Sequence, residues 1–257
     1  MQSYTFSDGK VMSYEDFGKS SKKVILIHHG LVTSPLDEGI WGSYCEQRGM
    51  RLILPHRSGH DGSSYFSEES YLDLAKRFVE LLDALGVDKF AICGISAGAP
   101  HSYATGFLCK QKALGVYIYS GLGAIYDDEV LRGYGEYYDK LKSLYHFARS
   151  NTREKTGEFF VQKYKQYERE LWELIKERSV AVGYEIALQA KEWGFRVSDL
   201  QSPIVIRHSK ADTKTPFLAA LNTAKIIPNS EFIEVSDEPH FTEKAFTDFL
   251  ELIISRI

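Results

Sequence analysis

The chain has 257 residues, of which 44% are hydrophobic and 26% are charged, and its formal net charge is −4. This composition is typical of globular proteins and excludes a disordered or fibrous chain. A mildly acidic protein has no general electrostatic attraction to nucleic acid or to anionic membranes, so we expect neither as a partner.

The number of cysteines and the lengths of the apolar runs exclude further classes of protein. The three cysteines, Cys45, Cys93 and Cys109, are too few and too scattered for a disulfide framework or a cysteine-based zinc site. The apolar runs are far shorter than the roughly 18 residues that a membrane-spanning helix needs. The first residues lack the basic start and the apolar core of a signal peptide. We therefore expect a soluble, cytoplasmic protein without a membrane span.

The chain opens with two short alternating segments on either side of Asp8-Gly9. Because Asp-Gly favours a type I′ turn, we predict an antiparallel hairpin here. The pattern then changes to short runs that are apolar on both faces, as parallel strands covered by helices require. These runs are Val24–Ile27, Leu52–Leu54, Phe90–Cys93, Val116–Tyr119, Ile204–Ile206 and Phe232–Val235.

A helix is predicted between the second and third runs. Apolar residues recur there at spacings of three and four from Tyr71 to Leu85. Ser70 and Asp73 resemble a capping box at its start, and Gly86 fits its C-terminal stop. Alternation of strands and helices predicts right-handed crossovers and a doubly wound α/β sheet.

The interval from about Gly121 to Ser202 breaks this alternation, because it contains no strand-like run. It is rich in Tyr, Glu and Lys. Spacings of four and three predict one helical face, which we expect to pack on neighbouring helices. A functional alternative is that the insertion also covers a pocket. The residues of this predicted face are Phe160, Tyr164, Tyr167, Leu171 and Leu174.

The strongest functional motif is Gly94-Ile95-Ser96-Ala97-Gly98. It follows an apolar run and precedes a plausible helix, which is the context of a nucleophile elbow. Glycines two positions either side of the serine let the strand and helix backbones approach closely. Ser96 would present its hydroxyl at the helix N-terminus, where developing negative charge is favoured. Pro100 is tolerated because it falls in the first helical turn.

With this motif the chain resembles the α/β-hydrolase superfamily, serine esterases with a helical cap, over nearly its whole length. The resemblance implies a hydrolase core from residues 1–120 and 203–257 and a cap insertion over residues 121–202. It also implies an oxyanion hole formed by the backbone N–H groups of Leu31, which follows His28-His29-Gly30, and Ala97. Residues 56–64 are similar to the family's D-x-R-G-x-G-x-S turn, with His56 in place of the usual aspartate.

A serine nucleophile needs a base, and the base needs an orienting acid. In the family these follow the serine in the order acid, then histidine. His240 lies in the loop after the last apolar run and matches the family's histidine loop. Asp212 follows the run ending at Ile206 and precedes a proline, which matches the family's acid turn. We therefore predict a triad of Ser96, Asp212 and His240. The rival acids are Asp199, Asp237 and Glu238, and the rival histidines are His101, His146 and His208.

This assignment predicts hydrolysis of a carboxylic ester or related acyl bond of a small, moderately apolar substrate through an acyl-enzyme. No cofactor and no metal is expected, although His28, His29, His56, His60 and Asp61 follow predicted strands. Ser96 argues against epoxide hydrolases and haloalkane dehalogenases, which place aspartate at the elbow. Lyase and aminopeptidase variants that use the same triad stay open, as do haloperoxidase side activity and a catalytically slow ligand-binding receptor. The sequence predicts no particular oligomeric state.

Overall fold

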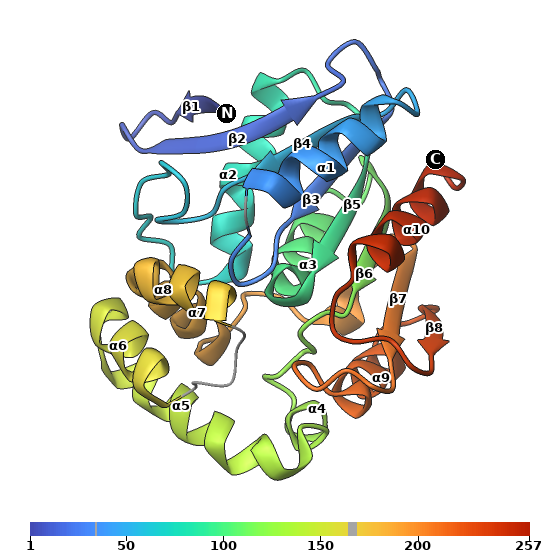
Figure 1. Ribbon diagram of the computed structural model, residues 1–257. Helices are drawn as coiled ribbons and strands as arrows, with labels where there is room; N and C mark the ends of the chain where they lie inside the picture. The colour runs from blue at the N-terminus through green and yellow to red at the C-terminus, as the bar shows by residue number, and fades with distance from the viewer. Residues whose placement is uncertain (34, 164–168) are drawn as a thin grey trace.

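A single sheet with helices on both faces organises the chain (Figure 1). The computed structural model describes residues 1–33, 35–163 and 169–257. Its sheet has eight strands in the order β1-β2-β4-β3-β5-β6-β7-β8. The pairs β1–β2 and β2–β4 are antiparallel, and the remaining pairs are parallel. The predicted α/β class, with a mostly parallel sheet and an antiparallel N-terminal hairpin, is therefore confirmed.

The strands are β1 (Gln2–Thr5), β2 (Val11–Phe17), β3 (Val24–His28), β4 (Arg51–Pro55), β5 (Phe90–Ile95), β6 (Ala113–Tyr119), β7 (Ile204–Ser209) and β8 (Glu231–Val235). The α-helices are α1 (Pro35–Glu46), α2 (Tyr71–Ala84), α3 (Ala99–Leu108), α4 (Asp128–Arg132), α5 (Tyr138–Ser150), α6 (Arg153–Lys163), α7 (Arg169–Glu177), α8 (Ser179–Ala190), α9 (Phe217–Ile226) and α10 (Glu243–Ile254). Short 3-10 turns lie at η1 (Ser96–Gly98), η2 (Gly135–Tyr137) and η3 (Val197–Asp199). Each of the six predicted parallel runs lies within one of the strands β3 to β8.

The hairpin forms as predicted, but its turn is of a different type. Gly9 has a φ of 78°, whereas Asp8 is not among the residues with positive φ, which a type I′ turn would require. The N–H of Gly9 donates to the carbonyl of Phe6, and Phe6 donates to Lys10, so the loop has three residues. The Asp8 carboxylate accepts from the Lys10 N–H at 3.0 Å and stabilises this alternative.

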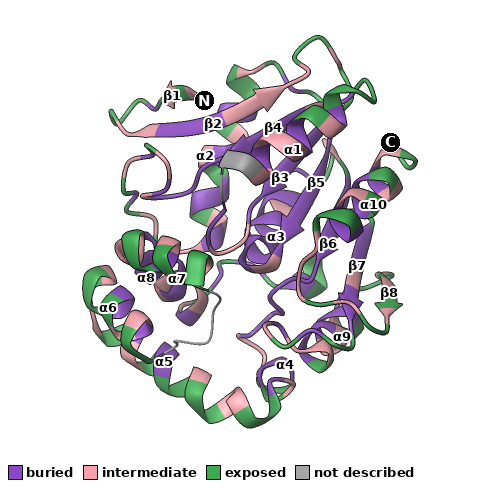
Figure 2. Ribbon diagram, in the orientation of Figure 1, coloured by how far each residue is buried: buried purple, intermediate pink, exposed green. Residues whose placement is uncertain are grey.

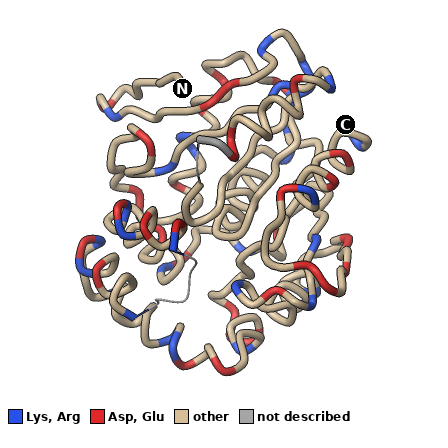
Figure 3. The backbone as a smooth tube through the Cα atoms, viewed as in Figure 1, with Lys and Arg blue, Asp and Glu red and all other residues tan. Residues whose placement is uncertain are grey.

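The sheet buries an apolar layer on each face (Figure 2). Along β3, Val24 and Leu26 belong to one layer and Ile25 and Ile27 to the other. Helices α2, α3 and α9 contribute to the first layer, and α1 and α10 contribute to the second. This is the two-sided covering that continuous apolar strands require. No described helix is both long and apolar enough to cross a membrane. Acidic and basic residues are interspersed along the outer helices (Figure 3).

Helix α2 begins and ends where the sequence predicts. Ser70 is its N-cap, and its hydroxyl accepts from the N–H of Asp73 at 3.1 Å. Gly86 follows the last turn with a φ of 68°, a conformation that glycine adopts without a steric penalty. The N-cap at Ser70 and the glycine stop are therefore confirmed, but Asp73 accepts from the Ser70 hydroxyl at 2.7 Å and not from its backbone N–H, as a full capping box would require.

The interval between β6 and β7 holds helices α4 to α8 (Figure 1). Within the described part of residues 121–202 there is no strand, as expected. The predicted continuous face from Phe160 to Leu174 is divided, because α6 ends at Lys163 and α7 begins at Arg169. Tyr164 and Tyr167 lie outside the described residues. Treating residues 121–202 as a separate cap stays a prediction.

Two glycines allow the backbones of α6 and α8 to touch. A Cβ at Gly157 would lie 1.9 Å from the carbonyl oxygen of Ser179, and a Cβ at Gly183 would lie 1.9 Å from that of Arg153. Real Cβ atoms do not approach backbone oxygens so closely. The crossing of these two helices therefore depends on the absence of side chains at both positions.

We predict that Gly183→Ala lowers the free energy of unfolding by about 1–3 kcal/mol, because the helices must separate to admit a methyl group. Gly39→Ala is the matched control. Gly39 lies inside α1, and a Cβ there meets no described atom within 4 Å. An alanine at that position should be neutral or stabilise by about 0.5–1 kcal/mol. Urea unfolding of both variants measures the difference, and equal stabilities would contradict the tight crossing.

Candidate active site

Ser96 lies at the turn between β5 and α3. Its φ is 52°, one of the few positive values among non-glycine residues of the described chain. Such conformations cost about 1–3 kcal/mol and persist only where the surrounding structure holds them. Here the carbonyl of Ser96 accepts from the N–H of Leu122, which ties the turn to the segment after β6. The structure thus has the strand–turn–helix context predicted for the motif.

The two motif glycines lie where backbones converge. A Cβ at Gly98 would lie 2.1 Å from the carbonyl oxygen of His28, at the end of β3. A Cβ at Gly94 would lie 2.5 Å from the Ser102 hydroxyl and 3.0 Å from the Cα of Ala99. Both contacts explain the requirement for glycine. They also place the start of α3 directly against the end of β3, next to the loop that carries Leu31.

The structure brings Asp212 and His240 together. Nδ1 of His240 lies 2.8 Å from Oδ2 of Asp212. Asp212 is buried in the turn after β7, and His240 lies in the loop after β8 with 22% of its side chain exposed. Because a carboxylate only accepts hydrogen bonds, Nδ1 is the protonated nitrogen of this pair. That leaves Nε2 as the nitrogen available to another partner.

Thr215 and His208 complete the surroundings of Asp212, and sequence analysis missed Thr215 altogether. The Thr215 hydroxyl lies 2.9 Å from both Oδ2 of Asp212 and the carbonyl oxygen of Ser120. Nε2 of His208, on β7, lies 3.3 Å from Oδ2. Burial alone would raise the pKa of Asp212, but the hydrogen bonds from His208 and His240 outweigh it and hold the pKa well below its usual range. Asp212 is therefore ionised at neutral pH.

Apart from His208, which contacts Asp212, the rival acids and histidines have other surroundings. Asp199 and Asp237 are exposed, and Glu238 forms an ion pair with Arg207. His146 is exposed on α5, and His101 is buried on α3. Asp212 is the only carboxylate within ion-pair distance of His240 among the described residues.

Ser96 and His240 line the same cavity, which has a volume of about 730 Å³. Leu31 and Ala97, the predicted oxyanion-hole residues, also line it. The described hydrogen bonds do not include one between Ser96 and His240. Catalytic hydrogen bonds are often long in ligand-free structures, so this separation does not decide the role of either residue. The catalytic and oxyanion-hole roles stay predictions.

Comparison with known proteins agrees with this architecture. A family model described as "alpha/beta hydrolase fold" matches residues 23–106. An esterase from Exiguobacterium antarcticum is 17% identical with a TM-score of 0.74, over 99% of each chain. A thermophilic esterase from Thermogutta terrifontis is 18% identical with a TM-score of 0.68, covering 100% of this chain and 99% of its own. Epoxide hydrolases from metagenomes of hot environments are 17% identical with a TM-score of 0.72, covering 98% of this chain and 97% of theirs. No curated protein sequence matches.

The chain has the α/β-hydrolase fold. The matched family model lies on the segment from β3 to α3 that carries the elbow, and it supports assignment to the α/β-hydrolase superfamily. The similar structures include enzymes of different chemistry. Because their sequence identity to this chain is low, the similarity shows the fold alone. The chemistry of this hydrolase-fold protein must therefore be argued from its own site.

Arg57 connects the loop after β3, which carries Leu31, to the helical insertion. Its guanidinium donates to the carbonyl oxygens of His29 and Gly30, both at 2.7 Å, and to Oε1 of Glu185 at 2.8 Å. Arg57 follows β4, Glu185 lies on α8, and both side chains are fully buried. Arg57 belongs to the segment 56–64 that is similar to the family's turn motif, and it supplies the contacts to the loop after β3. Its partner Glu185 was not predicted.

Glu185 also contacts His101, whose Nε2 lies 2.9 Å from Oε2. Burial lowers the pKa of His101, so the ring is neutral at neutral pH and donates this hydrogen bond as the Nε2–H tautomer. Burial acts to raise the pKa of Glu185, but the charge of Arg57 and the contact with His101 lower it well below its usual range. The network is thus a buried ion pair with one added donor, which is how a buried charge is tolerated.

Several polar residues near this network have the chemistry of metal ligands. His29 and His60 have ring centroids 5.1 Å apart, and burial lowers the pKa of both, to about 3 for His60. Neutral imidazoles are competent ligands. Among the described residues, however, the group whose ligand atoms lie close enough together to hold a metal ion consists of Glu15, Glu38 and His56.

We predict that Glu185→Gln loses about 3 kcal/mol of stability at neutral pH, because it leaves the buried Arg57 charge without its counter-ion. Since the folded-state pKa of Glu185 is depressed, its contribution is present above the unfolded glutamate pKa of about 4.3 and is lost as the pH falls. The difference in Tm between wild type and variant should therefore shrink below about pH 4. Exposed Glu158→Gln is the control and should match wild type. A Tm difference that stays constant from pH 7 to pH 3 would contradict the buried ion pair.

Proposed function

We propose that the protein is a serine hydrolase that cleaves a carboxylic ester or related acyl bond through an acyl-enzyme. The observation that carries this proposal is the contact of 2.8 Å between Asp212 and His240, with His240 on the same cavity as Ser96. An ionised acid at Nδ1 orients the ring and leaves Nε2 free to act as a base. A serine at the elbow argues for acyl transfer and against the alkyl-ester chemistry of aspartate enzymes.

In this mechanism Nε2 of His240 removes the proton of Ser96 as the serine attacks the substrate carbonyl. Asp212 stabilises the imidazolium that forms. The N–H groups of Leu31 and Ala97 stabilise the tetrahedral oxyanion, and each such donor typically contributes about 3 kcal/mol. His240 then donates its proton to the leaving alcohol. Water activated by the same ring hydrolyses the acyl-enzyme and restores Ser96.

The composition of the cavity wall supports a moderately apolar substrate. Besides Ser96 and His240, the cavity is lined by many apolar and aromatic residues of the insertion. These are Tyr134, Tyr137, Leu141, Leu144, Tyr145, Phe160, Leu171, Ile175 and Ile186. We therefore propose that residues 121–202 act as a cap that selects the substrate, since apolar walls with few polar groups are typical of small-molecule sites.

We predict that Ser96→Ala abolishes turnover of p-nitrophenyl esters and leaves the fold intact, because it removes one oxygen atom from a turn that the backbone holds. A fluorophosphonate probe should label Ser96 in the wild type, and mass spectrometry of the labelled peptide identifies the site. Circular dichroism and Tm give the control for folding. Labelling of another serine, or wild-type turnover in the alanine variant, would refute the serine mechanism.

We predict that Asp212→Asn lowers kcat/KM by at least roughly a hundredfold, since the comparable change in a serine protease costs about ten-thousand-fold. The amide removes the charge that stabilises the imidazolium and can donate to Nδ1, which inverts the tautomer. Asp199→Asn and Asp237→Asn are the matched controls, because both residues are exposed and have no described contact with His240. Loss of activity in either control, with wild-type activity in Asp212→Asn, would transfer the acid role.

A further inference from the structure

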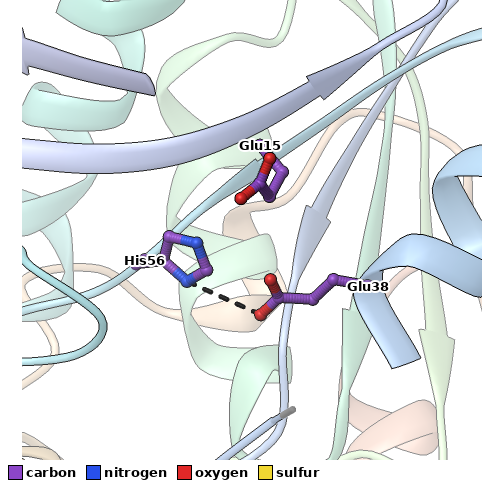
Figure 4. Close-up of side chains that lie close together, drawn as sticks. All are labelled: Glu15, Glu38 and His56. Atoms are coloured by element: carbon purple, nitrogen blue, oxygen red, sulfur yellow. Dashed lines mark ion pairs between the residues drawn. The ribbon is translucent and has the colours of Figure 1, made fainter. Parts of the chain in front are cut away.

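A second polar cluster lies behind the oxyanion loop, where three separate segments meet. Glu15 comes from β2, Glu38 from α1, and His56 from the residue directly after β4. One ligand atom from each of the three lies within 4.8 Å of the other two. Figure 4 shows the three side chains pointing toward one another, with Glu38 and His56 face to face. The proposed acyl-transfer mechanism uses none of them.

The cluster contains buried polar atoms without hydrogen-bond partners. His56 is 1% exposed and Glu38 is 3% exposed. Among the described residues, both ring nitrogens of His56, Oε1 of Glu38 and Oδ2 of neighbouring Asp61 find no hydrogen-bond partner. Buried polar atoms in native proteins are nearly always satisfied, and an unsatisfied set calls for an explanation such as an ion. Three of these atoms, Nδ1 of His56, Oε1 of Glu38 and Oδ2 of Asp61, lie near one another.

The distances between these atoms suit a metal better than a hydrogen bond. Nδ1 of His56 lies 3.6 Å from Oε1 of Glu38 and 3.6 Å from Oδ2 of Asp61. A hydrogen bond would require about 3.2 Å or less. Ligand atoms around a tetrahedral zinc ion, at about 2.1 Å from the metal, lie about 3.4 Å from one another.

Three acidic side chains and two cationic groups surround the cluster. Glu15, Glu38 and Asp61 are opposed by Arg178, which contacts Oδ1 of Asp61 at 2.6 Å, and by the amino group of Met1, 2.9 Å from Oε2 of Glu15. Met1 is more than half exposed, whereas Glu15 is largely buried.

We propose that Glu15, Glu38 and His56 form a binding site for Zn²⁺, with Asp61 beside it. The imidazole ligand distinguishes this set from the all-oxygen sites that Mg²⁺ and Ca²⁺ prefer. A bound ion would link β2, α1 and the segment after β4, and so support the loop that carries Leu31. The proposal departs from the sequence-based expectation of no metal, which considered His56 and Asp61 with nearby histidines and not with Glu15 and Glu38.

Calorimetric titration of ZnCl₂ into untagged, chelator-treated protein tests the site, with elemental analysis after dialysis to give the stoichiometry. We expect one Zn²⁺ per chain, a rise in Tm with Zn²⁺, and no comparable effect of MgCl₂. Glu38→Gln and His56→Gln should each weaken Zn²⁺ binding by at least about tenfold, since loss of even an outer-shell partner costs 10–100-fold. Exposed Glu158→Gln and His146→Gln are the matched controls and should bind as wild type does.

Glu15→Gln keeps the test decisive if the two buried variants fail to fold, because Glu15 is only partly buried. It should also weaken Zn²⁺ binding by at least about tenfold, with an unchanged circular dichroism spectrum. The proposal is overturned if wild type retains no Zn²⁺, if Mg²⁺ binds equally well, or if the folded variants bind Zn²⁺ as wild type does. None of these readouts depends on the esterase activity.

Discussion

The contact between the start of α3 and the end of β3 is the constraint on which the rest of the site depends. Gly98 lies so close to the His28 carbonyl that no side chain fits between them. This contact places Ser96 beside the loop after β3, where Leu31 and the cavity begin. It also holds Ser96 at a positive φ. The local strain is offset by the buried sheet around it, since β5 pairs with β3 and β6 along its length.

Burial of the Arg57–Glu185 pair extends this constraint to the helical insertion. A guanidinium that is fully removed from water needs both a counter-ion and acceptors for its remaining donors. Glu185 on α8 supplies the charge, and the carbonyls of His29 and Gly30 supply the acceptors. The loop that carries Leu31 is therefore held by strand β3, from which it continues, and through Arg57 by Glu185 on α8. A change in the position of α8 would reach that loop through two hydrogen bonds and one ion pair.

The features that sequence analysis predicted correctly are those that depend on local patterns. The apolar runs of β3 to β8, the cap at Ser70 and the turn at Ser96 all follow from neighbouring residues. The predicted type of the Asp8-Gly9 turn was wrong, because the Asp8 carboxylate accepts from the Lys10 N–H and from Arg77. Asp212 and His240 could be proposed only from a family resemblance, because residues 28 positions apart in sequence carry no pairing signal of their own.

The residues that sequence analysis missed are single polar side chains that distant segments bring together. Thr215, Glu185 and Glu38 have no motif, because their partners come from other elements and the spacing between them is set by the tertiary fold. What identifies them is burial. A carboxylate on an otherwise apolar helix such as α8, or an acid in the first turn of α1, looks like a solvent-facing residue until the fold encloses it. Once enclosed, each must find a donor or a cation. In the described part of the chain, Glu185 has Arg57, Asp212 has His240 and Thr215, and Oε1 of Glu38 lies 3.6 Å from Nδ1 of His56. The same physical argument that accounts for the first two groups motivates the proposed cation beside the third.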